Sequence, residues 1–161
     1  MMGWVPLKFR QTFLLRMFGF FKIPMLLFVS PSVLELSDQR CVVRVPLSWR
    51  TRNHLNSMYF GALAVGADCA GGLMVTHFIQ QTKSSISLIF KDFHADYLKR
   101  AEGDVVFSCE QGSDVKEFVY QVLQTGERKN FPLRIVATVP THFGDEPVAY
   151  FLLTVSLKKK T

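Results

Sequence analysis

The chain has 161 residues, 48% hydrophobic and 20% charged, so it is long enough for one folded domain and too apolar for a disordered segment. Its formal net charge of +6 favours anionic partners, but no basic helix interleaved with aromatic residues is present, which argues against nucleic acid. Cys41, Cys69 and Cys109 are widely spaced and form no Cys-x-x-Cys pair. This pattern indicates neither a zinc site nor a disulfide framework, and it predicts a reducing compartment, the cytoplasm.

The N-terminal part, residues 1–31, is expected to be a helical segment of a single domain that covers residues 1–161. Charged residues and Pro24 interrupt its apolar run, so no stretch of about 20 clean residues could span a bilayer. Apolar residues at helical spacing predict an amphipathic helix with Arg10 and Arg16 toward its polar side. We expect this segment to cover the core, and contact with a membrane surface is the alternative. The apolar residues are Phe13, Leu14, Met17, Phe18 and Phe21.

Strands dominate the remainder of the chain on either side of one long helix. The apolar period changes to two at Val33, which predicts a strand pair, and a polar loop then leads into a helix over 58–79. A capping-box pattern at Asp114 predicts a shorter helix that ends near Gly126. The predicted strands are 33–36, 40–47, 84–97, 105–109, 131–139 and 148–157.

The long helix contains an acidic residue, Asp68, that its surroundings do not explain. The helix is apolar on nearly every side, which predicts that it is buried. Its many glycine and alanine residues lower helix propensity, and this cost is understandable if a neighbouring backbone comes very close. A buried carboxylate without a local partner is expensive, so Asp68 is a candidate for chemistry. The alternative is a structural acid that meets backbone N–H groups or a remote arginine.

This order of elements predicts an α+β domain in which a curved antiparallel sheet wraps around the central helix. The pattern resembles the hotdog fold of acyl-CoA thioesterases. In the phenylacetyl-CoA type, an Asn precedes a His-Gly-Gly at the helix start, and an acid follows seven positions after the second Gly. Asn53, Gly61 and Asp68 match these spacings, whereas Tyr59 and Phe60 replace the His and the first Gly. The N-terminal helices and the strand at 91–97 resemble a thioesterase-like hotdog subfamily labelled as a domain of unknown function.

The resemblance implies hydrolysis of an acyl-CoA thioester, with coenzyme A as part of the substrate and with no cofactor or metal. Asp68 would be the general base or nucleophile, the Gly61 N–H would polarise the carbonyl, and Asn53 would orient water. A rise of about 1.5 Å per residue puts Asp68 roughly 10 Å from Gly61 of the same helix. The site would therefore be shared in a homodimer or a dimer of dimers. Candidate substrate-binding residues are His54, Asn56, Met58, Tyr59 and Phe60.

Other functions remain open for this sequence. The main alternative is a non-catalytic hotdog protein that binds acyl groups or lipid, and a dehydratase would need an Asp–His pair that only His54 could complete. Asn53 has a loop or N-cap role as its alternative. His94 alternates with two aspartates, which permits a metal site but equally a polar strand face. Lys99, Arg100 and the C-terminal lysines could contact coenzyme A phosphates or simply be solvated.

Overall fold

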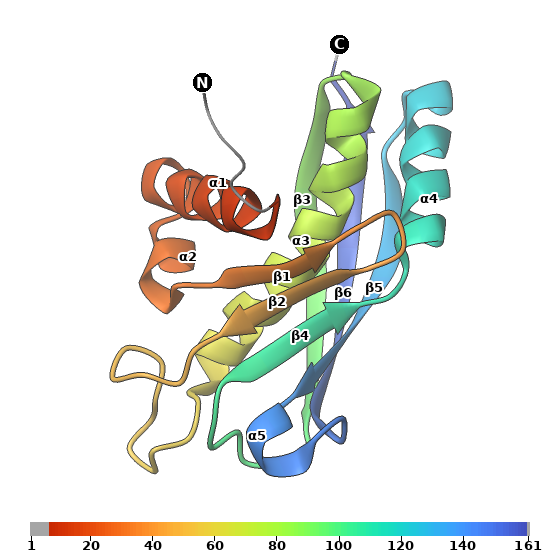
Figure 1. Ribbon diagram of the computed structural model, residues 1–161. Coiled ribbons are helices and arrows are strands. Elements are labelled where there is room, and N and C mark those ends of the chain that lie inside the picture. Colours follow the sequence, from red (N-terminus) through yellow and green to blue (C-terminus); the bar gives the residue numbers. More distant parts are fainter. Residues whose placement is uncertain (1–6, 161) are drawn as a thin grey trace.

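The elements follow the predicted order of two helices, two strands, a long helix, and four strands with a helix between them (Figure 1). The computed structural model describes residues 7–160, with side chains from residue 9 onward, so residues 1–6 and Thr161 of the predicted domain lie outside the described part. The helices are α1 (Leu7–Phe21), α2 (Pro24–Val29), α3 (Phe60–Thr82), α4 (Gly112–Thr125) and α5 (Pro140–Phe143). The strands are β1 (Ser32–Leu36), β2 (Cys41–Val45), β3 (Ile86–Tyr97), β4 (Val105–Cys109), β5 (Lys129–Thr138) and β6 (Pro147–Lys159).

All six strands form one antiparallel sheet in the order β1-β2-β4-β5-β6-β3. The strands β3 and β6 pair along almost their whole length, from Ile86 opposite Lys159 to Tyr97 opposite Ala149. The sheet curves around α3, and β3 remains an edge strand, with no strand from residues 7–160 on its outer side (Figure 1). The predicted α+β architecture of a curved antiparallel sheet around one long helix is therefore confirmed.

Small residues on α3 allow the sheet to approach the helix closely. A Cβ atom at Gly66 would collide with the ring of Phe107 on β4, and one at Gly71 would lie 3.1 Å from Leu133 Cδ1 on β5. The helix is long and apolar enough to cross a bilayer, yet 56% of its most apolar window is buried inside the fold. The glycines that lower helix propensity are thus used for packing, as the sequence predicted.

The boundaries of several elements differ from the predictions. The helix α3 begins and ends a few residues later than 58–79, because Tyr59 is extended and the helix ends only at Lys83, whose φ is 54°. The capping box at Asp114 does not form, since α4 already begins at Gly112, whose N–H donates to Gln39 O. The short helix α5 was not predicted.

The predicted orientation of α1 is wrong. Phe13 and Phe21, assigned to the core-facing side, are 63% and 67% exposed, whereas Leu15 is only 5% exposed. Hydrogen bonds fix the helix in this orientation: Thr12 Oγ1 accepts from the Val33 N–H, and Arg16 Nε donates to Pro31 O. These contacts join α1 to the start of β1 and turn Phe13 and Phe21 outward, whereas Leu14 and Phe18 of the predicted stripe line a cavity next to α3.

Candidate functional site

Asp68 projects from the middle of α3 into a cavity of about 620 Å³ that lies between α1, α2, β1, α3 and β3. It makes no hydrogen bond or ion pair with any residue that the structure describes. The alternative role of Asp68, a structural acid paired with a remote arginine, therefore finds no such arginine among the described residues. The absence of a local partner, predicted from the sequence, therefore extends to the tertiary structure.

Burial changes the acid chemistry of Asp68. Removal from solvent raises the pKa of its carboxyl from 3.8 to about 6, because the charged form loses hydration without gaining a counter-charge. The carboxylate is still the main form at neutral pH, and its pKa lies close to the range in which a general base is most effective. Asp68 can accept a proton here more readily than an exposed aspartate can.

The cavity is mainly apolar, and most of its polar groups come from α3, with Arg10 and Gln11 of α1 adding the others. Asp68, Gly72, Thr76 and Gln80 recur every four residues and so lie on the same side of the helix. A cavity of this size with few polar groups is typical of a small-ligand site. The remaining lining residues are Arg10, Gln11, Leu14, Leu15, Phe18, Ile23, Leu26, Val33, Leu36, Cys69, Leu73, His77, Leu88 and Phe90.

A hydrogen-bonded group at the rim of this cavity was not predicted. His77 Nε2 lies 2.9 Å from Asp38 Oδ1, and Gln81 Nε2 donates to the same oxygen at 3.2 Å. These bonds lower the pKa of Asp38 and tie the turn between β1 and β2 to α3. The pairing joins residues 39 positions apart, so no local pattern could reveal it, whereas the four-residue stripe from Asp68 to Gln80 was readable from the sequence.

Cys69, next to the candidate carboxylate, is not equipped to act as a nucleophile. Its side chain is 4% exposed, and burial together with the Asp68 charge raises the pKa of the thiol well above its ordinary value. A thiol that stays protonated is a poor nucleophile. Cys69 therefore packs as a small apolar residue.

The N-terminus of α3 forms a second group of candidate residues. No acceptor for the Phe60, Gly61 or Ala62 N–H groups is present among the residues that the structure describes, and no side chain caps the helix. The ring of Tyr59 stands against Gly61, with Cε1 only 2.6 Å from where a Cβ would be. These unpaired amides could stabilise developing negative charge, and a glycine is needed where the ring approaches.

Asn53 organises the loop before α3 instead of facing the cavity. Its Oδ1 accepts from the Leu55 N–H at 2.8 Å and from the Ser57 N–H at 3.2 Å. The backbone N–H of Asn53 donates to the backbone carbonyl of Ser57 at 2.8 Å. The side-chain carbonyl thus has two backbone donors already, which is the loop role that the sequence left open. The N-cap position itself belongs to Tyr59.

The predicted substrate-binding residues are scattered around this loop. His54, Asn56 and Phe60 are exposed, and Asn56 occupies the left-handed region with φ of 60°. Met58 is 3% exposed and belongs to the core. None of these residues, nor Tyr59, lines the cavity that holds Asp68. One chain therefore brings Asp68 together with an apolar cavity, but it does not bring Asp68 together with Gly61 and the loop.

Lys99, Arg100 and His94 form ion pairs or close contacts with acidic residues on the surface. Lys99 pairs with Glu146, and Arg100 pairs with Glu102 at 3.0 Å. His94 Nε2 lies 3.4 Å from Asp96 Oδ1 in an exposed position. Across residues 7–160, no cluster of three His, Cys, Asp or Glu side chains that could hold a metal ion is present.

Comparison with solved structures identifies the fold. A Pseudomonas aeruginosa protein of unknown function, described as a probable thioesterase, aligns with 98% of this chain and 100% of its own at a TM-score of 0.75 and 20% identity. A protein of unknown function from Chlorobaculum tepidum aligns with a TM-score of 0.81 at 14% identity, covering 95% of this chain and 97% of its own. A Haemophilus influenzae thioesterase aligns with a TM-score of 0.63 at 11% identity, covering 84% of this chain and 82% of its own.

These similarities, with the observed sheet and central helix, establish a hotdog fold of the kind found in thioesterase-like proteins. The chain belongs to the family described as Domain of unknown function (DUF4442), which matches residues 11–149. No curated protein sequence matches it. The two resemblances predicted from the sequence, to the hotdog fold and to a thioesterase-like domain of unknown function, are confirmed.

Proposed function

We propose that the protein hydrolyses acyl-CoA thioesters, with Asp68 as general base or nucleophile. The observation that supports this proposal best is a carboxyl that pairs with none of the described residues and has a pKa raised to about 6, in the wall of an apolar cavity. An acyl chain would occupy the cavity and present its thioester carbonyl to Asp68. Fold similarity to thioesterases is consistent with the proposal but does not by itself establish activity.

In the general-base form of the reaction, Asp68 removes a proton from water as the water oxygen attacks the thioester carbonyl carbon. The C–S bond then breaks, the acyl group leaves as a carboxylic acid, and the proton goes to the departing thiolate of coenzyme A. In the nucleophilic form, the carboxylate attacks the carbonyl carbon, the C–S bond breaks and coenzyme A leaves as the thiolate, and water then hydrolyses the anhydride to the carboxylic acid and free Asp68. The raised pKa suits the first form because it increases the basicity of the carboxylate.

The carbonyl oxygen needs a donor that Asp68's own helix end is too distant to supply. We infer that the Gly61 N–H of a second subunit provides it. The free edge of β3 supports such a dimer: it is 12 residues long, and its Ile89 and Phe93 are 52% and 43% exposed. A long apolar edge strand favours pairing with another chain. Leu88 and Phe90 of β3 also line the cavity, so a partner paired along this edge would lie beside Asp68.

Hydrolysis of a panel of aliphatic and aromatic acyl-CoA esters, followed by release of free thiol, tests the proposal. Wild type should turn over at least one member, and Asp68→Asn should lose about 100-fold or more in kcat/KM, as expected for removal of a general base. Asp145→Asn, a matched change at an exposed aspartate, should leave the rate unchanged. Equal rates for wild type and Asp68→Asn would contradict the assigned role.

The alternative function is binding of acyl groups or lipid without catalysis. The observation in its favour is the Tyr59 ring, which stands against Gly61 where the resemblance would have a histidine. This function predicts that acyl-CoA or fatty acid binds with measurable affinity while no thiol is released by wild type.

A further inference from the structure

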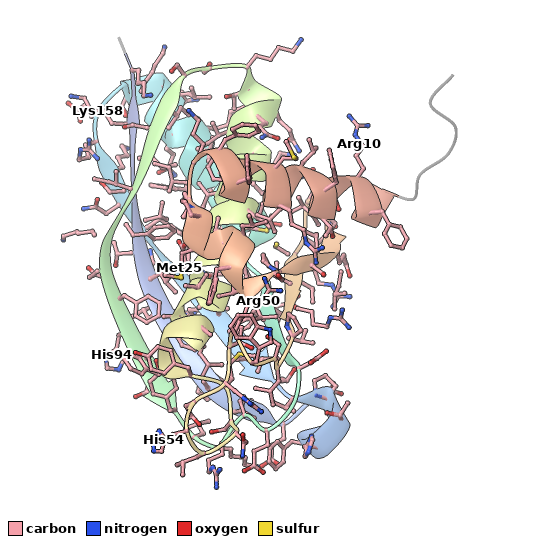
Figure 2. All side chains as sticks on the ribbon, turned by 90° about the vertical axis from the view of Figure 1, so that its left-hand side faces the viewer. Arg10, Met25, Arg50, His54, His94 and Lys158 are labelled. Carbon is pink, nitrogen blue, oxygen red and sulfur yellow. The ribbon has the colours of Figure 1, made fainter. Side chains whose placement is uncertain are left out.

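The outward side of the two N-terminal helices carries an exposed apolar surface, which we call the α1–α2 surface. Its aromatic members on α1, Phe13, Phe20 and Phe21, are between 62% and 67% exposed. Met25 of α2 is 56% exposed, and Trp49, in the loop after β2, is 75% exposed. Figure 2 shows α1 and α2 on one face of the molecule, with Met25 and Arg50 on that same side. The α1–α2 surface consists of Phe13, Met17, Phe20, Phe21, Met25, Phe28 and Trp49.

This arrangement reverses the usual pattern of a helix that covers a core. Such a helix normally buries its apolar stripe and exposes charged residues. In α1 the buried contacts are made by Leu15 and Gly19, while Phe13, Met17 and Phe20 face solvent. A contiguous apolar patch of large side chains is uncommon on a monomer surface and marks an interaction site. The side-chain hydrogen bonds of Thr12 and Arg16 hold α1 in this orientation.

Charge around the surface has a single sign. Residues 9–34, whose side chains the structure describes, contain three basic residues, Arg10, Arg16 and Lys22, and no aspartate or glutamate. Arg50 adds a fourth cation, with its guanidinium 5.9 Å from the ring centre of Phe28 and 6.0 Å from that of Trp49. Its Nη2 also donates to Ser30 Oγ at 3.0 Å. An exposed aromatic face bordered by a few lysine and arginine side chains is typical of a helix that lies in a lipid headgroup layer.

We propose that the α1–α2 surface binds peripherally to anionic lipid bilayers, with α1 parallel to the membrane plane. The apolar side chains enter the boundary between headgroups and acyl chains, and the cations meet acidic headgroups. A second copy of the chain fits this surface poorly, because a two-fold interface sets the same patch of each copy against the other, so cations would face a patch whose described charged residues are also cations. The helix α1 also supplies Leu14, Leu15 and Phe18 to the cavity wall, so docking brings the cavity close to the lipid phase.

Flotation with lipid vesicles tests this proposal on the full chain and does not depend on catalysis. Vesicles of phosphatidylcholine with about a third phosphatidylglycerol should carry wild type upward, and vesicles of phosphatidylcholine alone should carry much less. Phe13→Gln with Phe20→Gln should lower the partition coefficient by at least about tenfold, because both rings lose their burial in lipid. The matched control is Tyr120→Gln with Tyr150→Gln, two aromatics that are 47% and 45% exposed outside the α1–α2 surface, and it should float like wild type.

Two further double variants test the contribution of the cations to membrane binding. Lys22→Gln with Arg50→Gln should lower the partition coefficient about 20-fold, whereas Lys158→Gln with Lys159→Gln removes the same charge elsewhere and should have little effect. All four pairs change exposed residues, so unchanged circular dichroism is expected. Equal flotation of wild type and the two test pairs would overturn the proposal. It would also be overturned if Phe13→Gln with Phe20→Gln halved the molar mass measured by light scattering without lipid, because a second copy would then cover the surface.

Discussion

Replacement of Asp68 by asparagine should stabilise the protein at neutral pH, and the size of the gain follows from the position of the carboxyl. The native pKa of about 6 lies above the ordinary value of 3.8, which approximates the unfolded chain. Ionised Asp68 therefore costs stability, and the difference corresponds to about 3 kcal/mol. Because the carboxyl is only partly buried, solvent screening reduces the expected gain to about 2 kcal/mol.

The size of this effect changes across a defined pH window, while its sign stays the same. Below about pH 3.8 both the native and the unfolded carboxyl are protonated, so Asp68→Asn should have little effect. Between about 3.8 and 6 the native state holds the proton more tightly, so wild type loses stability relative to the variant as the pH rises. Above about pH 6 both forms are ionised, and the full penalty is present.

Urea unfolding at fixed protein concentration, at about pH 4 and about pH 8, measures this difference directly. Asp68→Asn should unfold at higher urea than wild type at the higher pH and at nearly the same urea at the lower one. Asp145→Asn, at an exposed position, should stay within about 0.5 kcal/mol of wild type at both. A loss of stability in Asp68→Asn at about pH 8 would refute the reasoning, since it would mean that the carboxylate makes a stabilising contact.

Three further experiments test other parts of the structure. Gly72→Leu should lower kcat/KM for the longest accepted acyl chain by about tenfold or more relative to Gly72→Ala. The reason is that a side chain at position 72 would enter the cavity, where the nearest atom to a Cβ is Phe90 Cζ at 3.8 Å. An unchanged chain-length profile would contradict binding of the acyl group in this cavity. Gly66→Ala should destabilise by about 1–3 kcal/mol in urea unfolding, because its methyl group meets the Phe107 ring, and a gain in stability would mean that the ring moves aside freely. Cys69 should resist alkylation by iodoacetamide in the folded protein, and rapid labelling would show that the helix opens at this position.

The fold was accessible from the sequence because its signals are local. Strand alternation, as in Cys41, Val43 and Val45, survives in the structure because one face of each strand is buried. The run of small residues on α3 correctly predicted close packing, and Gly66 against Phe107 shows the reason. The orientation of α1 was missed, since its apolar residues outnumber the positions that face the core and the deciding contact is the bond from Val33 to Thr12.

The candidate site, too, was predictable from the sequence only where its signals are local. Asp68 was identified because a charge in an apolar helix is visible in one dimension, and the structure retains it without a partner among the described residues. The loop around Asn53 was assigned by spacing, but its hydrogen bonds to Leu55 and Ser57 depend on a turn that spacing does not specify. The pair formed by His77 and Asp38 joins distant segments and needed the folded structure.

Activity in mixed dimers tests the central claim that Asp68 of one subunit acts with the Gly61 N–H of another. Gly61→Pro removes that N–H in the first turn of α3, where the backbone tolerates proline and the exposed Tyr59 ring must turn aside to make room for the added Cβ, and Asp68→Asn removes the carboxylate. Each variant alone should be nearly inactive on acyl-CoA. Refolded together, they should recover about a quarter of wild-type activity, because about half of the dimers are mixed and each has one of two sites intact. No recovery beyond the sum of the two separate variants, in dimers shown to be mixed, would contradict a site shared between subunits.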